Sequence, residues 1–164
     1  MKELFLVLFS VTLLGSVAIA GQSKHESLQG AWQTVEIAMT GPGARTIAIP
    51  EPRANLIVFT ARHYSQLHLD AEGPRPALAD ATTASADQLR AVWGPFAGDA
   101  GSYEVHDGVI TMRPVVARSP SAMAPGAFTT YAYRLDGNTL WVTFQKNQDG
   151  PIVNPVTIKA VRVE

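Results

Sequence analysis

The sequence contains no cysteine, which excludes disulfide bonds and zinc sites built on cysteine thiolates. A fold without these cross-links must be held by buried apolar surface and hydrogen-bonded secondary structure, and an apolar content of 46% is enough for a substantial core. The formal net charge is −1 and no run of basic residues occurs. Nucleic acid and anionic membrane surfaces are therefore not expected as main partners.

The sequence also lacks the short motifs of common catalytic and cofactor sites. It has no nucleophile-elbow pattern, no phosphate-binding loop and no dinucleotide-binding glycine pattern. The histidines show none of the spacings used for metal binding, and we favour solvated surface positions for all four: His25, His63, His68 and His106. We expect no cofactor and no metal.

A long apolar run occurs only near the N-terminus. Lys2 is followed by an apolar stretch over residues 4–14, and then by Ala18 and Ala20 in the spacing of a signal-peptidase site. The run is too short, and contains too many polar residues, to be a good candidate for a transmembrane helix. We predict that residues 1–20 are a signal peptide cleaved after Ala20. Residues 21–164 then form one domain, secreted or periplasmic, without an integral membrane segment.

Turn residues divide the rest of the chain into short alternating segments typical of an all-β protein. Eight strands are expected, at residues 31–39, 54–60, 63–69, 101–106, 109–116, 128–135, 139–146 and 155–163. Their connections alternate between long and tight. In an up-and-down meander all tight turns then lie at one end and all long loops at the other. We predict an eight-stranded antiparallel barrel with a closed base and an elaborated rim, which leaves no free sheet edge.

The longest connection, residues 70–100, contains a helical pattern at 85–97. Ser85 is a plausible N-cap, Leu89, Val92, Trp93 and Phe96 recur at helical spacing, and Pro95 limits the helix. This helix could be a lid that brings Trp93 and Phe96 onto a ligand. It could equally plug the barrel permanently or pack on its side.

Three residues are expected to close the base. Gly30 and Trp32 begin the first strand, and Arg162 lies in the last strand. An indole can fill the closed end of a barrel, a guanidinium over its face adds cation–π attraction, and a glycine lets the backbone enter tightly.

Alternation along the strands separates an apolar face from a polar face. Placing the apolar face inside gives the barrel a lining suited to an apolar ligand, with tyrosine hydroxyls as polar contacts. The candidate ligand-binding residues are the helix aromatics Trp93 and Phe96 together with the strand residues Leu67, Leu69, Tyr103, Met112, Tyr131, Tyr133 and Phe144.

Two assignments of strand faces stay open. Tyr64, Gln66 and His68 share one face, and we favour an outward polar face over a polar constellation inside the barrel. In residues 31–39 no single alternation holds, because Ile37 and Trp32 fall on opposite faces. A bulge near Gln33 or Thr34 would reconcile them, and without it Glu36 would lie inside.

Several segments resemble the bacterial lipocalin-like domain family, within the lipocalin and calycin group. They are residues 28–32, 56–64, 101–105 and 133–140, and the resemblance extends over residues 28–164. The sequence departs from it at Arg62 and His63, where a turn such as Asp-Gly is expected. The resemblance implies a barrel that binds small, mostly apolar molecules, and some relatives are cyclases or isomerases. We predict a carrier of a small apolar ligand. The alternatives are a cavity enzyme or a module whose rim loops bind a protein.

Overall fold

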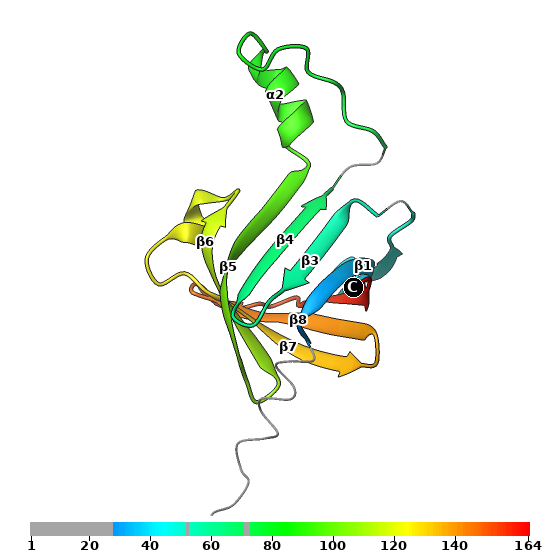
Figure 1. Ribbon diagram of the computed structural model, residues 1–164, viewed down its shortest axis with the longest axis vertical. Coiled ribbons are helices and arrows are strands. Elements are labelled where there is room, and N and C mark those ends of the chain that lie inside the picture. The colour runs from blue at the N-terminus through cyan, green and yellow to red at the C-terminus, as the bar shows by residue number, and fades with distance from the viewer. Residues whose placement is uncertain (1–27, 52, 71–72) are drawn as a thin grey trace, which may run out of the picture.

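The structure is a computed structural model, and it describes residues 28–51, 53–70 and 73–164. The expected signal peptide and His25 lie outside these residues. Eight strands form a closed antiparallel barrel in the order β10-β1-β3-β4-β5-β6-β7-β8, with β8 pairing back onto β10 (Figure 1). The elements are β1 (Gly30–Met39), β2 (Arg45–Ala48), β3 (Asn55–Phe59), β4 (His63–Leu69), α2 (Ala86–Trp93), β5 (Phe96–His106), β6 (Val109–Ala117), the 3-10 helix η1 (Pro120–Met123), β7 (Thr129–Asp136), β8 (Thr139–Asn147), β9 (Gly150–Pro151) and β10 (Val156–Arg162). The predicted fold class is confirmed.

Tight turns connect β3 to β4, β5 to β6 and β7 to β8. Asp107 and Gly108 both have positive φ, 48° and 76°, as the two-residue hairpin turn with right-handed strand twist requires. Arg62 and His63 occupy the position where a turn such as Asp-Gly was expected. Here hydrogen bonds of Thr60 close the turn. Its backbone N–H donates to the His63 carbonyl at 2.8 Å, and its hydroxyl accepts from the His63 N–H at 3.1 Å.

The base contains the three residues that the sequence analysis placed there. Trp32 is fully buried, and its indole N–H donates to the Leu28 carbonyl at 2.9 Å. The guanidinium of Arg162 lies 4.1 Å from the centre of the Trp32 ring. Gly30 has φ of 129°, and a Cβ there would lie 2.4 Å from the Glu164 carbonyl oxygen. A side chain at position 30 would therefore break the contact between the two chain segments that close the base.

A bulge in β1 resolves the mixed alternation of that strand. The register with β10 shifts between Thr34 and Glu36, so that Thr34 and Ile37 both border the interior. The expected bulge is present. Glu36 pairs with Lys159, whose ammonium lies over the outward Trp141 ring at 5.9 Å, so Glu36 is not an interior carboxylate.

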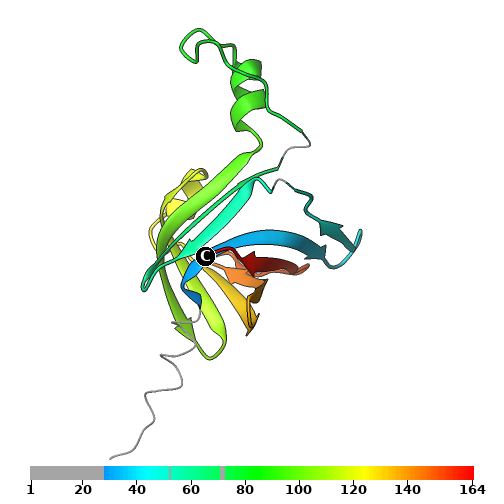
Figure 2. The ribbon, with the colours of Figure 1, turned by 45° about the vertical axis from the view of Figure 1, so that its right-hand side comes forward.

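β1 changes partner along its length. Gly30–Trp32 pair with β3, but Glu36–Met39 pair with β2, which lies in the stretch expected to be a loop. Figure 2 shows the resulting β1–β2 hairpin extending away from β3 and β4 on the rim side. The direct pairing of β1 with β3 is therefore confined to the base end of the strand.

The helix is shorter than predicted and ends at Trp93. Ser85 and Gln88 form a reciprocal capping box, and β5 begins at Phe96, directly after Pro95. No residue of α2 is buried, and the helix projects beyond the barrel in both views (Figures 1 and 2). Within the described ranges, no helix has the length and apolar character needed to cross a membrane.

Candidate functional site

Two adjoining cavities lie at the rim end of the barrel. The apolar cavity has a volume of about 220 Å³ and is lined mainly by apolar side chains, with a polar edge: Thr34, Ile37, Ile49, Ala54, Asn55, Ile57, Gln66, Leu67, His68, Leu69, Asp70, Tyr131, Phe144 and Ile158. The polar cavity, of about 450 Å³, is lined by Gln66, His68, Ala97, Gly98, Asp99, Ala117, Arg118, Ser119 and Ala122. Gln66 and His68 border both, so the two cavities meet there.

Below the cavities the barrel is filled by its own side chains. Phe59 and Tyr103 pack edge to face with ring centres 5.1 Å apart, above the buried Trp32. The Tyr103 hydroxyl donates to the Thr60 carbonyl at 2.7 Å, and burial raises the pKa of Tyr103 to about 12. A ligand can therefore occupy only the upper half of the barrel.

A carboxylate and an amide face each other at the junction of the cavities. Gln66 of β4 lies opposite Asp99 of β5, and its side-chain N–H group donates to both carboxylate oxygens, at 3.1 and 3.2 Å. None of the ion pairs in the described part of the chain involves Asp99. A carboxylate can accept about four hydrogen bonds, so Asp99 keeps unused acceptor capacity.

Two tyrosines complete this group. Tyr64 is only 3% exposed, and its hydroxyl makes no hydrogen bond of normal geometry with the described residues. Burial raises the pKa of Tyr64, and the neighbouring Asp99 raises it further through its negative charge and a long hydrogen-bonding contact with the phenol. Burial and the charge of Asp99 also raise the pKa of Tyr131. Both phenols therefore stay protonated at neutral pH as hydrogen-bonding groups. We call Tyr64, Gln66, Asp99 and Tyr131 the interior polar cluster.

The orientation expected for β4 is wrong. The structure buries Tyr64 and turns Gln66 to Asp99, whereas the side chain of Leu67 is 45% exposed and lies over Gly98. Leu67 also pairs with the exposed Leu56 of β3. The assumption that the apolar face of each strand points inward fails at β4. The large Tyr64 ring fills the core, and the residues that follow it on the same inner face are polar. Leu67 and Leu69 border both the apolar cavity and an outer groove.

The helix aromatics do not line the barrel cavities. Trp93 is 56% exposed and lies edge to face with Phe96, with ring centres 6.4 Å apart. Phe96 pairs with Leu69 and borders an outer groove together with Leu56 and Leu67. In this structure α2 does not cover the barrel opening, because it ends before Pro95 and projects away from the barrel.

The other candidate residues face the interior at different depths. Tyr131 and Phe144 border the apolar cavity, with ring centres 4.6 Å apart. Met112 is buried in the core, and Tyr133 packs against it; neither borders the two cavities. Gln66 and Asp99 were missed as a pair. Gln66 shares the face of Tyr64, which was a usable signal, whereas Asp99 lies among small residues that gave no strand pattern.

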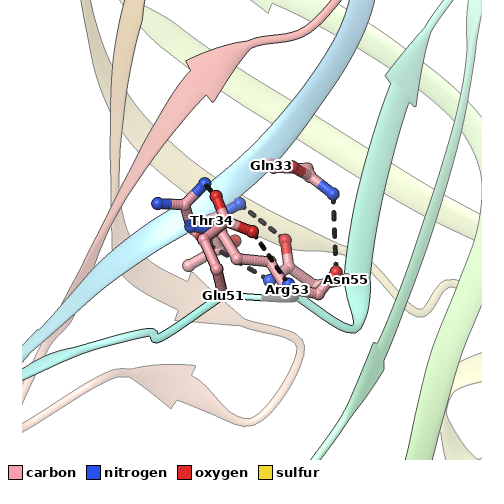
Figure 3. A network of polar contacts seen from close by, with 5 residues as sticks. All are labelled: Gln33, Thr34, Glu51, Arg53 and Asn55. Carbon is pink, nitrogen blue, oxygen red and sulfur yellow. Dashed lines mark hydrogen bonds and ion pairs between the residues drawn. The ribbon is translucent and has the colours of Figure 1, made fainter.

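A side-chain network closes the seam where β1 leaves β3 (Figure 3). The Asn55 carboxamide accepts from the Thr34 backbone N–H at 2.6 Å and donates to the Thr34 carbonyl at 3.2 Å. Gln33 donates to the Arg53 carbonyl at 3.4 Å, and Arg53 pairs with Glu51. These contacts replace the strand pairing that ends at Trp32. Of these residues, Thr34 and Asn55 border the apolar cavity.

Comparison with known proteins agrees with this barrel. The family model described as "Lipocalin-like domain" matches residues 29–156. This chain belongs to that lipocalin-like family. A crystal structure of an uncharacterized protein from Bacteroides eggerthii aligns with a TM-score of 0.43 and 10% identity, over 82% of this chain and 98% of that one. No curated protein matches the sequence.

The interior polar cluster is the chemically distinctive part of this lipocalin-like barrel. Across the parts of the chain that the structure describes, no three His, Asp or Glu side chains gather in a way that could hold a metal ion. The chemically distinctive groups are the Asp99 carboxylate, the Gln66 amide and the two phenols beside them.

Proposed function

We propose that this lipocalin-like protein is exported and binds a small, largely apolar molecule in the upper half of its barrel. The observation that carries the proposal is the apolar cavity, walled by Ile37, Ile57, Phe144 and Ile158 above a filled base. Such a cavity gains about 25 cal/mol for each Å² of apolar surface that a ligand removes from water. The neighbouring polar cluster fixes the ligand's orientation, as a few polar groups do in most apolar sites.

A titration of residues 21–164 with a hydrophobic fluorophore tests this function. We expect one saturable site from which small apolar alcohols displace the fluorophore. Ala54 is exposed and borders the apolar cavity, so Ala54→Trp should obstruct it and weaken binding about tenfold or more without disturbing the core. Ala61→Trp, in the exposed turn at the base, is the matched control and should bind like wild type. Absence of saturable binding by the folded protein would contradict the proposal.

Export rests on the N-terminal pattern alone. We expect protein recovered from the periplasm or medium of its host to begin at residue 21, because the signal-peptidase site ends at Ala20. N-terminal sequencing gives the answer directly, and a cytosolic protein that retains residues 1–20 would contradict export.

The interior polar cluster supports a second candidate, an isomerase or cyclase. Asp99 could take up a proton while the neutral hydroxyls of Tyr64 and Tyr131 stabilise developing negative charge. Incubation with apolar metabolites of the host, followed by mass spectrometry and NMR, distinguishes the two. A bound compound released unchanged supports carriage. Conversion that is lost in Asp99→Asn supports catalysis.

A further inference from the structure

The Asp99 carboxylate borders the polar cavity and has acceptor capacity beyond its bond with Gln66. It stands on the inner face of β5 and receives a single side-chain N–H group, from Gln66, which lies between its two oxygens. No Lys, Arg or His of the described chain forms an ion pair with it. Asp99 is partly buried and borders the polar cavity, where a positively charged group that also donates hydrogen bonds is a favourable partner for a carboxylate. The barrel wall thus presents a negative charge whose remaining lone pairs are unused.

The neighbouring phenols add oxygen atoms that can accept as well as donate. The Tyr64 hydroxyl meets the geometric criteria for a hydrogen bond with none of the described residues, but it lies beside Asp99, whose charge acts on both Tyr64 and Tyr131. A protonated amine carries three donors and a positive charge. One such group can donate to Asp99 and to a phenol oxygen together, with the strength of a charge-assisted hydrogen bond.

The interior polar cluster lies next to the proposed ligand site, where it can bind a protonated amine at one end of a ligand. Gln66 borders both cavities, whereas Arg118 borders the polar cavity alone. A ligand whose tail fills the apolar cavity therefore brings its head first to Gln66 and Asp99. His68 also borders both cavities, but its side chain is 47% exposed and lies 3.4 Å from the Asp70 carboxylate.

The geometry points to a barrel that selects amphiphilic ligands with a cationic amine head, bound to Asp99. This inference rests on the proposed ligand-binding function and specifies the ligand class for the same site. A carboxylate head would meet the like charge of Asp99 and is disfavoured at this position. A neutral alcohol lacks the charge and should bind with intermediate affinity.

Three probes of equal chain length test the selectivity: octylamine, octanol and octanoate. Each competes with the bound fluorophore at neutral pH, where an alkyl amine is protonated. We expect octylamine to bind about tenfold or more tightly than octanol, and octanoate to bind more weakly than octanol. Asp99→Asn should bring octylamine to within about twofold of octanol while octanol affinity is retained. Glu104→Gln removes one exposed carboxylate from the same strand and should change none of the three affinities.

The outcomes separate this inference from the proposed function. If none of the three probes binds to the folded protein, the proposed function itself fails. If all bind equally, or if Asp99→Asn leaves the octylamine preference intact, only the amine selectivity fails. Tightest binding of octanoate, lost in Arg118→Gln, would show instead a site for anionic ligands. The wild-type ranking of the probes decides the matter even if Asp99→Asn does not fold.

Discussion

Two buried tyrosines of the barrel differ in one contact. Tyr103 and Tyr64 are each 3% exposed, but the Tyr103 hydroxyl donates to the Thr60 carbonyl and the Tyr64 hydroxyl has no partner of normal geometry. A satisfied buried hydroxyl contributes about 0.5–1.5 kcal/mol, whereas an unsatisfied one costs stability. Buried polar groups that lack a hydrogen-bond partner are expected mainly at functional sites. Tyr64 borders neither cavity, but it lies beside Asp99, so its hydroxyl is linked to the ligand site through that carboxylate.

A matched pair of variants tests this distinction. Tyr103→Phe should lower the free energy of unfolding by about 0.5–1.5 kcal/mol, because it leaves the Thr60 carbonyl without its donor. Tyr64→Phe should leave the free energy of unfolding unchanged or raise it, and should weaken octylamine binding. Urea unfolding and the fluorophore competition provide both measurements. A Tyr64→Phe protein less stable than Tyr103→Phe would show that the Tyr64 hydroxyl is structural.

The base contact between Trp32 and Arg162 should be measurable as a coupling. Trp32→Ala should cost about 3–5 kcal/mol, as removal of a large buried aromatic does, and Arg162→Ala should cost less. Because the guanidinium lies over the indole, the double variant should be less destabilised than the sum of the two single variants, by about 0.5–2 kcal/mol. Additive effects in urea unfolding would mean that the ring and the cation do not interact.

Individual side chains were predictable where topology restrained them. Trp32 and Arg162 could be placed together because a closed meander brings its first and last strands side by side at the base. Tyr64 and Gln66 could not, because alternation says which residues share a face but not which face is inside. At β4 the polar face is the inner one. The burial of Tyr64 and the contact of Gln66 with Asp99 of the next strand reveal this.

At the scale of elements, β1 is the strand that shapes the site. It pairs with β3 for three residues, bulges, and then pairs with β2, so that the barrel wall opens beside Asn55. The Asn55 carboxamide satisfies both backbone groups of Thr34, a residue only 8% exposed. The Asn55 side chain thus replaces the backbone hydrogen bonds between β1 and β3 beyond Trp32.

Removal of that side chain should open the seam. We expect Asn55→Ala to lower the free energy of unfolding by about 1–3 kcal/mol, because the Thr34 N–H loses its acceptor in a largely buried place. Asn147→Ala removes an amide that caps an exposed turn, through the Asp149 N–H at 2.9 Å, and should cost much less. Amide hydrogen exchange at Thr34 should accelerate in the first variant alone. Equal stability of the two variants would contradict the role given to Asn55.

Strands with alternating or β-branched residues were predicted close to their observed bounds. β2 was missed because Gly41, Pro42 and Gly43 mark a loop, and nothing local shows that the chain after it returns to β1. The start of β5 was missed because Phe96 continues the helical spacing of Trp93. The small residues after Phe96 carry no strand signal, and their pairing with β4 is a tertiary effect.

The whole molecule is a barrel filled at its base and hollow at its rim. Trp32, Phe59 and Tyr103 provide the packed half that stabilises the fold. The other half contains the two cavities and the interior polar cluster, whose unsatisfied groups are tolerated because the base and the closed sheet hold the strands in place. Stability and binding are thus assigned to opposite ends of one sheet.

The buried tyrosines make stability depend on alkaline pH. Their pKa values are raised in the folded protein above the ordinary value of 10, to about 12 for Tyr103. The unfolded chain therefore releases these protons first, so the stabilisation is complete below pH 10 and is lost as the pH rises from about 10 to about 12. Urea unfolding across this range should show the loss, and Tyr103→Phe should reduce its slope. A free energy of unfolding that does not fall above pH 10 would contradict the burial of these phenols.

The central claim, a ligand inside the rim half of the barrel, is tested most directly by NMR. Residues 21–164 labelled with ¹⁵N are titrated with octanol, a neutral ligand that does not depend on the charge of Asp99. The account predicts saturable amide shifts concentrated at Ile37, Ile57, Gln66, Tyr131 and Phe144. The indole N–H signals of the base Trp32 and the exposed Trp93 should not move. Shifts centred on Trp93 and the outer Leu56 and Leu67, or no shifts at saturating octanol, would contradict it.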